Sequence, residues 1–223
     1  MGQKHEFESS DESAAYYRLV EGAFKRLAPY YDAATRPFRP LRERVADCIT
    51  PCAGLRLLDV ATGTGAQALA FAEQGCLVAG ADLSEAMIRV AQGKNSAGKV
   101  MFEIADATRL PFLNGSFDAS CISFALHDMP HAIRERVLGE MVRVTKSGGT
   151  VLVADYSLPG NALGRSLVFH FLALYEAEYY REFIKSDVHQ LLSEARIEVL
   201  WEASALWGAA RIINGLTARE TDG

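Results

Sequence analysis

Apolar residues in this chain form short continuous runs that alternate with segments of helical period. Five runs are short and rich in Val, Leu and Ala, and they predict buried strands over 55–60, 76–81, 100–104, 117–124 and 150–156. Between them, helical spacing predicts helices over 66–74, after Ser84 as an N-cap, and over 130–144, which Ser147-Gly148-Gly149 closes. This alternation predicts an α/β fold with a mostly parallel sheet and helices on both faces.

Further elements flank this core. The pattern predicts a helix over 16–27 that Pro29 ends, a second helix over 41–49 and a polar, frayed segment 1–13. After Pro159 the pattern of apolar and polar positions changes. We expect a helix over 162–183 rich in Phe, Leu and Tyr, a helix over 187–195 capped by Ser186, and late strands over 197–203 and 207–213.

Composition narrows the function classes. The chain has 223 residues, which fits one α/β domain with additions. Its formal net charge is −5 and Lys and Arg do not cluster, so no nucleic acid partner is expected. Residues 1–15 are polar and acidic, and the most apolar later run, 167–174, is too short to span a bilayer. We expect no signal peptide, no membrane insertion and a cytoplasmic location.

The cysteines and histidines lack the spacing of a zinc site, so no metal is predicted. Cys48, Cys52, Cys76 and Cys121 are interpreted as free thiols in a reducing compartment.

Candidate chemistry begins at the first strand. Asp59 lies near its end and is followed by Gly63 and Gly65, which allow a tight turn and the close approach of backbone amides to a ligand. Asp82 ends the second strand about 20 residues later, where an acidic residue accepts both ribose hydroxyls of a nucleoside cofactor. Asp106 and Ala107 follow the third strand, where they could hold an adenine ring.

Together these features resemble a class I S-adenosylmethionine-dependent methyltransferase, most closely the ubiquinone/menaquinone-biosynthesis C-methyltransferase type. The resemblance covers roughly residues 20–156. It rests on Asp59-x-x-x-Gly63-x-Gly65, Asp82, Asp106-Ala107, Leu110-Pro111-Phe112 with Ser116-Phe117-Asp118, Arg143-Val144 with Gly148-Gly149, and the Tyr31-Asp32 pair.

The resemblance implies a Rossmann-like, doubly wound, seven-stranded sheet with an antiparallel last strand. It implies S-adenosyl-L-methionine as cofactor and S-adenosyl-L-homocysteine as product. It divides the chain into a tail and helical cover (1–50) and a methyltransferase domain (51–223) with a helical lid insertion (160–185), and leaves a homodimer open. The implied cofactor-binding residues are Asp59, Thr62, Gly63, Thr64, Gly65, Asp82, Leu83, Met87, Asp106, Ala107, Ser123 and Phe124.

The segment after the fourth strand departs from the family. Quinone methyltransferases of this type carry an Arg-Asn pair there, whereas this chain has Ala125-Leu126-His127-Asp128. His127 is the predicted catalytic base, with a wall or loop-capping histidine as the alternative. His131 is interpreted as solvent-facing, and His170 as a core histidine or a substrate contact.

Aromatic residues predict the acceptor. Two sets could close over the pocket and favour a small acceptor that is partly aromatic or hydrophobic, with Tyr31 as a second catalytic candidate. The sets are Tyr16, Tyr17, Tyr30 and Tyr31, and Tyr175, Tyr179, Tyr180 and Phe183. Two other functions remain open: an NAD-binding oxidoreductase, because Gly63-x-Gly65-x-x-Ala68 nearly fits the dinucleotide fingerprint, and a non-catalytic cofactor-binding protein.

Overall fold

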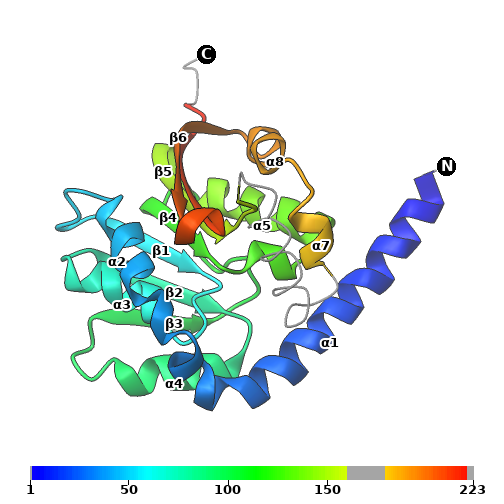
Figure 1. Cartoon of the computed structure of the whole chain (residues 1–223). Helices are drawn as coiled ribbons and strands as arrows, with labels where there is room; N and C mark the ends of the chain where they lie inside the picture. Colours follow the sequence, from blue (N-terminus) through cyan, green and yellow to red (C-terminus); the bar gives the residue numbers. More distant parts are fainter. Residues whose placement is uncertain (1, 160–178, 220–223) are drawn as a thin grey trace.

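A seven-stranded sheet forms the centre of the molecule (Figure 1). The computed structural model describes residues 2–159 and 179–219. The strand order is β3-β2-β1-β4-β5-β7-β6, and β7 runs antiparallel to both β5 and β6, as the resemblance predicted. The strands are β1 Arg56–Val60, β2 Leu77–Asp82, β3 Val100–Ile104, β4 Phe117–Ser123, β5 Thr145–Tyr156, β6 Ile197–Ala205 and β7 Ala210–Thr217.

Alternate residues of the central strands point to opposite faces of the sheet and pack into two separate hydrophobic cores. In β1, Leu58 packs toward α5 (His131–Val144), α8 (Val188–Glu194) and part of α1 (Gly2–Ala34). Its neighbour Leu57 packs toward α2 (Arg39–Asp47) and α3 (Ala66–Glu73) on the other face. Val153 and Leu152 of β5 divide in the same way. The period of two along each strand therefore makes a sheet buried on both faces.

The helices of the core begin close to the predicted positions. Ser84 caps α4 (Glu85–Lys94), and its hydroxyl accepts the backbone N–H of Met87 at 3.4 Å. The short 3-10 turns are η1 Arg36–Phe38, η2 Leu126–Asp128 and η3 Leu206–Gly208.

The N-terminal helix is longer than predicted. It runs from Gly2 through Pro29 to Ala34, so the expected frayed segment and the stop at Pro29 are both wrong. The helical turn after Pro29 is stabilised by residues outside the helix, because Asp32 accepts hydrogen bonds from Thr64 and Lys94. Figure 1 shows the N-terminal half of α1 extending away from the sheet domain.

Three later boundaries also differ. Residues 147–149 do not end a helix; they lie inside β5, which begins at Thr145 directly after α5. Asp187, not Ser186, caps α8, because its carboxylate accepts the N–H of Gln190. The last strand starts at Ala210 rather than at residue 207, because residues 206–208 form η3, with Trp207 in the left-handed region.

Two of the four cysteines are paired. Cys52 and Cys76 form a disulfide with a Cα–Cα distance of 5.0 Å, so the prediction of four free thiols is wrong, while Cys48 and Cys121 are free. The two cysteines are 24 residues apart, but each precedes a strand, and Arg56 of β1 pairs with Leu77 of β2. Parallel pairing thus brings them together at the edge opposite the strands' carboxyl ends.

Several predictions fall outside the described residues. These are most of the helix predicted over 162–183, His170 and Tyr175. Of the predicted helix, the structure describes only its end, which forms the short helix α7 (Tyr180–Phe183). Among the described residues, no helix has the length and apolar character needed to cross a bilayer.

Candidate active site

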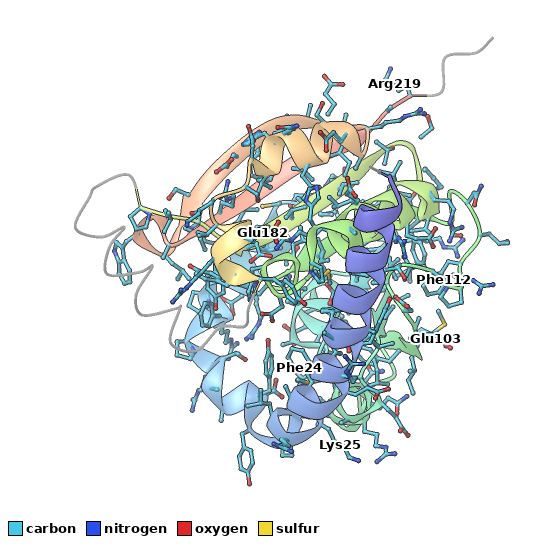
Figure 2. All side chains as sticks on the ribbon, turned by 90° about the vertical axis from the view of Figure 1, so that its right-hand side faces the viewer. Phe24, Lys25, Glu103, Phe112, Glu182 and Arg219 are labelled. Atoms are coloured by element: carbon cyan, nitrogen blue, oxygen red, sulfur yellow. A yellow bond between two sulfur atoms is a disulfide. The ribbon has the colours of Figure 1, made fainter. Side chains whose placement is uncertain are left out.

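A pocket opens at the carboxyl ends of β1, β2 and β4 and is covered by α1. Figure 2 shows α1 in front of the domain, with Phe24 of its pocket-lining side labelled. Most of the predicted site residues come together here: Tyr31, Thr62, Gly63, Thr64, Asp82, Leu83, Met87, Asp106, Ala107, Ser123 and Phe124 line the cavity. Asp59, Gly65 and His127 lie behind its wall instead.

The glycine turn is built as the sequence suggested. Gly63 has φ +55°, and a Cβ added there would meet nothing within 4 Å, so it leaves open space on the pocket side. Gly65 has φ +75° and begins α3, and a Cβ there would lie 2.5 Å from the ring of Phe102. The first glycine therefore makes room for a ligand, and the second makes room for the protein's own packing.

Asp59 lies beneath this turn and is fully buried. Its Oδ2 accepts the hydroxyl of Thr62 at 2.5 Å, and its Oδ1 has no hydrogen-bond partner among the described residues. Burial raises the pKa of Asp59 to about 7, although the bond from Thr62 opposes the shift. The carboxyl thus supports the turn from below.

Asp82 faces the pocket from the end of β2. Its Oδ2 accepts the N–H of Gly63 and its Oδ1 accepts the N–H of Ser84, both at 2.8 Å. Desolvation raises the pKa of this carboxyl, and the two backbone bonds oppose that shift. The aspartate is therefore fixed in place, with a remaining lone pair on each oxygen for a ligand.

Asp106 is tied to the covering helix. Its Oδ2 accepts the phenol of Tyr17 at 2.8 Å, and its Oδ1 accepts the N–H and the hydroxyl of Thr108 at 2.8 Å each. Beside it, Ala107 lines the same end of the pocket. The end that the sequence associates with adenine is thus closed by a residue of α1.

A second tie joins α1 to the glycine turn. The hydroxyl of Thr64 donates to Asp32 at 2.6 Å, and Lys94 of α4 reaches the other oxygen at 2.6 Å. Desolvation opposes ionisation of Asp32, but these two partners prevail and lower its pKa. Asp32 is therefore an ionised link between α1, the turn and α4.

The pocket is rich in negative charge. Asp82, Asp106 and Asp128 line it, and Arg42 is the cation among the described lining residues. Burial lowers the pKa of Arg42, and Tyr31, Asp32 and Asp59 counter that shift. Sequence reasoning missed Arg42, because a single arginine in a basic helix carries no signal of its own. Such a lining suits a ligand with positive charge better than a pyrophosphate.

The far end of the pocket is aromatic. Phe124, with φ +51° after β4, packs edge-on against Phe38 of η1 at 5.3 Å and against Tyr156 of β5 at 5.1 Å, measured between ring centroids. All three line the cavity beyond Ser123. This wall offers apolar ring edges to a flat ligand.

His127 stands behind Tyr156, at 4.7 Å between ring centroids. Its Nδ1 lies 2.7 Å from Oδ1 of Asp155, and its Nε2 lies 3.6 Å from Oδ2 of Asp128. Sequence reasoning missed Asp155, although a signal was present: like Asp59 and Asp82, it is an acid that ends a buried apolar run. His131 points outward, as expected, beside Glu135.

Comparisons with known proteins agree with this geometry. A methyltransferase domain family model matches residues 57–149. The ubiquinone/menaquinone biosynthesis C-methyltransferase UbiE of Geobacter sulfurreducens is 34% identical over 187 residues, which cover 75% of this chain and 72% of the relative. A demethylmenaquinone methyltransferase of Paenarthrobacter aurescens is 37% identical over 158 residues, 69% of this chain and 61% of the relative.

Solved structures support the fold. Magnesium protoporphyrin IX methyltransferase (ChlM) from Synechocystis PCC 6803, determined with bound S-adenosylhomocysteine, superposes with a TM-score of 0.69 at 16% identity, over 91% of this chain and all of that one. The matched family model, the relatives and the pocket at the strand ends agree with one another. The chain therefore belongs to the family of S-adenosylmethionine-dependent methyltransferases that includes the ubiquinone/menaquinone biosynthesis C-methyltransferases.

Proposed function

We propose that this protein transfers the methyl group of S-adenosylmethionine to a small, flat, hydroxylated aromatic acceptor. The observation that carries the proposal is the division of one pocket into two ends. In the strand order, Asp82, Asp106 and the glycine turn line the end at β1 to β3, and Asp128 with the rings of Phe38, Phe124 and Tyr156 lines the end at β4 and β5. A cofactor and an aromatic acceptor would meet between them, next to Ser123.

The residues at the polar end fit the cofactor. Gly63 leaves open space, Asp82 has acceptor capacity for two ribose hydroxyls, and Asp106 with Ala107 offers a carboxylate and a backbone amide to an adenine. Arg42 is placed to pair with the cofactor's α-carboxylate, and the three lining aspartates suit its sulfonium and ammonium charges. When bound, the sulfonium supplies an activated methyl group, so the protein's main task is positioning.

The aromatic end supports the acceptor class. Tyr31 from the last turn of α1 and Tyr156 add phenol groups to this aromatic wall. The relatives named above act in ubiquinone and menaquinone biosynthesis according to their names, which is consistent with an aromatic ring. Ala125-Leu126-His127-Asp128 stands where that type carries its Arg-Asn pair, so the proposal is the wider class of hydroxylated rings and not one particular quinone.

The test is a screen for formation of S-adenosylhomocysteine and of the methylated product by mass spectrometry. Acceptors would be catechol, hydroquinones with and without a prenyl tail, primary amines and thiols. We expect turnover with the hydroxylated rings, and turnover confined to amines or thiols would contradict the proposal.

A matched pair of variants tests the acceptor wall. Phe38→Ala should raise the KM for the aromatic acceptor about tenfold, by loss of apolar and ring contacts worth roughly 1–2 kcal/mol, and leave the Kd of S-adenosylmethionine unchanged. Tyr30→Ala, on a side chain that is 72% exposed, should change neither value. An unchanged KM in the Phe38 variant would remove the aromatic wall from acceptor binding.

A further inference from the structure

Gln67 of α3 has a side-chain oxygen that no other part of the described protein satisfies. The residue is the second of the helix, directly after the glycine turn, and it lines the pocket although only 4% of its surface is exposed. Its Oε1 is buried and has no hydrogen-bond partner among the described residues. A buried acceptor without a donor destabilises the folded protein, so we expect a group from outside the chain to donate to it.

The orientation of the amide is set by its nitrogen. Nε2 of Gln67 donates to the backbone carbonyl of Arg42 in α2 at 3.2 Å. If the amide were flipped, its oxygen would face that carbonyl and two acceptors would meet, so the nitrogen stays on the α2 side. The group that Oε1 binds must therefore be a hydrogen-bond donor, and an anion is excluded.

The position of Gln67 in the wall shows where such a donor comes from. Oδ1 of Asp59 is another buried acceptor near this turn without a partner among the described residues, but Asp59 lies behind the wall. Gln67 belongs to the lining itself, together with Arg42, Thr64 and Ala66. A donor to Gln67 is therefore expected from a ligand in the pocket.

The order of the strands identifies which part of the cofactor this is. Asp106 follows β3 and Asp82 ends β2, the positions that fit the adenine and the ribose. The order β3-β2-β1 then leaves the end of β1 for the amino-acid part. That part carries a carboxylate, which suits the guanidinium of Arg42, and an ammonium group, which can only donate hydrogen bonds. Gln67 offers the acceptor that the ammonium group needs.

We infer that Oε1 of Gln67 accepts a hydrogen bond from the α-ammonium group of S-adenosylmethionine, and that Gln67 and Arg42 together bind the two charged groups of its amino-acid part. The inference rests on the cofactor part of the proposed function and is independent of the acceptor class. Gln67 is a binding residue, because the ammonium group takes no part in methyl transfer.

Binding of three adenosine thioethers, measured by calorimetric titration, tests the assignment. They are S-adenosylhomocysteine, its carboxypropyl analogue, which lacks only the α-amino group, and its aminopropyl analogue, which lacks only the carboxylate. Gln67→Leu removes a hydrogen bond to a charged group, so it should raise the Kd of S-adenosylhomocysteine and of the aminopropyl analogue about 10- to 100-fold. The Kd of the carboxypropyl analogue should change less than about twofold. An equal loss for all three ligands would contradict a bond to the ammonium group.

Thermal unfolding without ligand separates binding from a structural role. Gln67→Leu removes one hydrogen bond together with a buried acceptor that lacks a donor, so Tm should stay the same or rise. The matched control is Gln74→Leu, because the exposed Gln74 at the end of α3 also joins that helix to α2, through Asp47 at 2.7 Å. It should leave all three Kd values unchanged. A lower Tm in Gln67→Leu with weaker binding of every ligand would mean that Gln67 only holds α3 against α2.

The outcomes also separate this inference from the proposed function. If wild-type protein does not bind S-adenosylhomocysteine, both are wrong. If binding depends on Gln67 as expected but no hydroxylated ring is methylated, the acceptor class alone is wrong. If Gln67→Leu binds S-adenosylhomocysteine as tightly as the wild type, the role of Gln67 is wrong and methyl transfer is unaffected.

Discussion

At the scale of single residues, the aspartates at the strand ends have different roles in the site. Asp59, Asp82 and Asp155 each end a buried apolar run, yet Asp82 alone of the three lines the pocket. Asp59 supports the turn and Asp155 supports the loop after β4. Sequence spacing predicted the first two as ligand contacts, because it gives position along the chain and not the direction of a side chain.

Asp59 gives a prediction about stability and pH. Its pKa is raised to about 7, so between about pH 4 and 7 the folded protein holds a proton that the unfolded chain has lost; the cost to stability grows over this range and is complete above pH 7. Asp59→Asn should therefore stabilise the cofactor-free protein by about 2–4 kcal/mol at pH 8 and by less than half of that at pH 5, measured by urea unfolding.

Asp118 serves as a control of opposite sign. Bonds from Lys146 and from the N–H of Arg56 lower its pKa, so Asp118→Asn should weaken the fold slightly at pH 8. A gain from Asp59→Asn that is equal at both pH values would contradict the assignment of the raised pKa.

The two turn glycines should respond differently to alanine. Gly65→Ala forces a Cβ to within 2.5 Å of Phe102 at φ +75° and should cost about 2–4 kcal/mol of stability. Gly63→Ala meets open space at φ +55° and should cost about 1–2 kcal/mol. Calorimetric titration should show weaker S-adenosylmethionine binding for Gly63→Ala even after folding is verified. Equal stability losses would remove the distinction between the two glycines.

At the scale of elements, Arg134 joins three segments. This fully buried residue of α5 donates to the carbonyls of Leu126 and Tyr179 and pairs with Glu182, so it ties the loop after β4 to α7. Arg134→Met removes the guanidinium from both carbonyls, which keep only their backbone donors at Met129 and Phe183, and should lower the free energy of unfolding by about 1–3 kcal/mol.

The matched control is Arg136→Met, an exposed position two residues further along the same helix, which should change stability by less than about 0.5 kcal/mol. Arg134→Lys should not restore the loss, because an ammonium group lacks the forked geometry that reaches all three partners. Full recovery in the lysine variant would show that charge alone is needed.

Element boundaries were predictable where local signals agree with packing. The turn at Gly63–Gly65, the cap at Ser84 and the strand ends at Asp82 and Ile104 follow from local chemistry. Pro29 did not end α1, since the turn after it is held by Thr64 and Lys94, which are far away in sequence. Contacts of that kind leave no local signal.

At the scale of the whole molecule, the charge of the pocket separates two cofactor classes. The lining carries three aspartates and one arginine among the described residues, and the N–H of Gly63 already donates to Asp82. S-adenosylmethionine at 100 times its Kd should stabilise the protein by about 2.7 kcal/mol and raise Tm by about 5–10 °C. NADH should leave Tm unchanged, and an equal shift with NADH would contradict this interpretation.

The seven strands and the antiparallel β7 were predictable from the fold that the resemblance implies, although the matching motifs themselves lie before residue 157. The pairing of Cys52 with Cys76 was not, since it depends on strand neighbours. The end at which we propose the acceptor binds was only partly predictable. Phe38, Tyr156 and Asp128 come from three separate segments, and folding alone brings them together.

The two ends of the pocket are built from different parts of the chain. The turn after β1, Asp82 and Asp106 lie in one continuous stretch of sequence, whereas the proposed acceptor wall is assembled from η1, η2 and the end of β5. Because these two sets share few residues, substitutions in the wall can change which acceptors are methylated without loss of binding of the methyl donor. The same separation makes positions 38, 124 and 156 the natural library for directed evolution toward new acceptors.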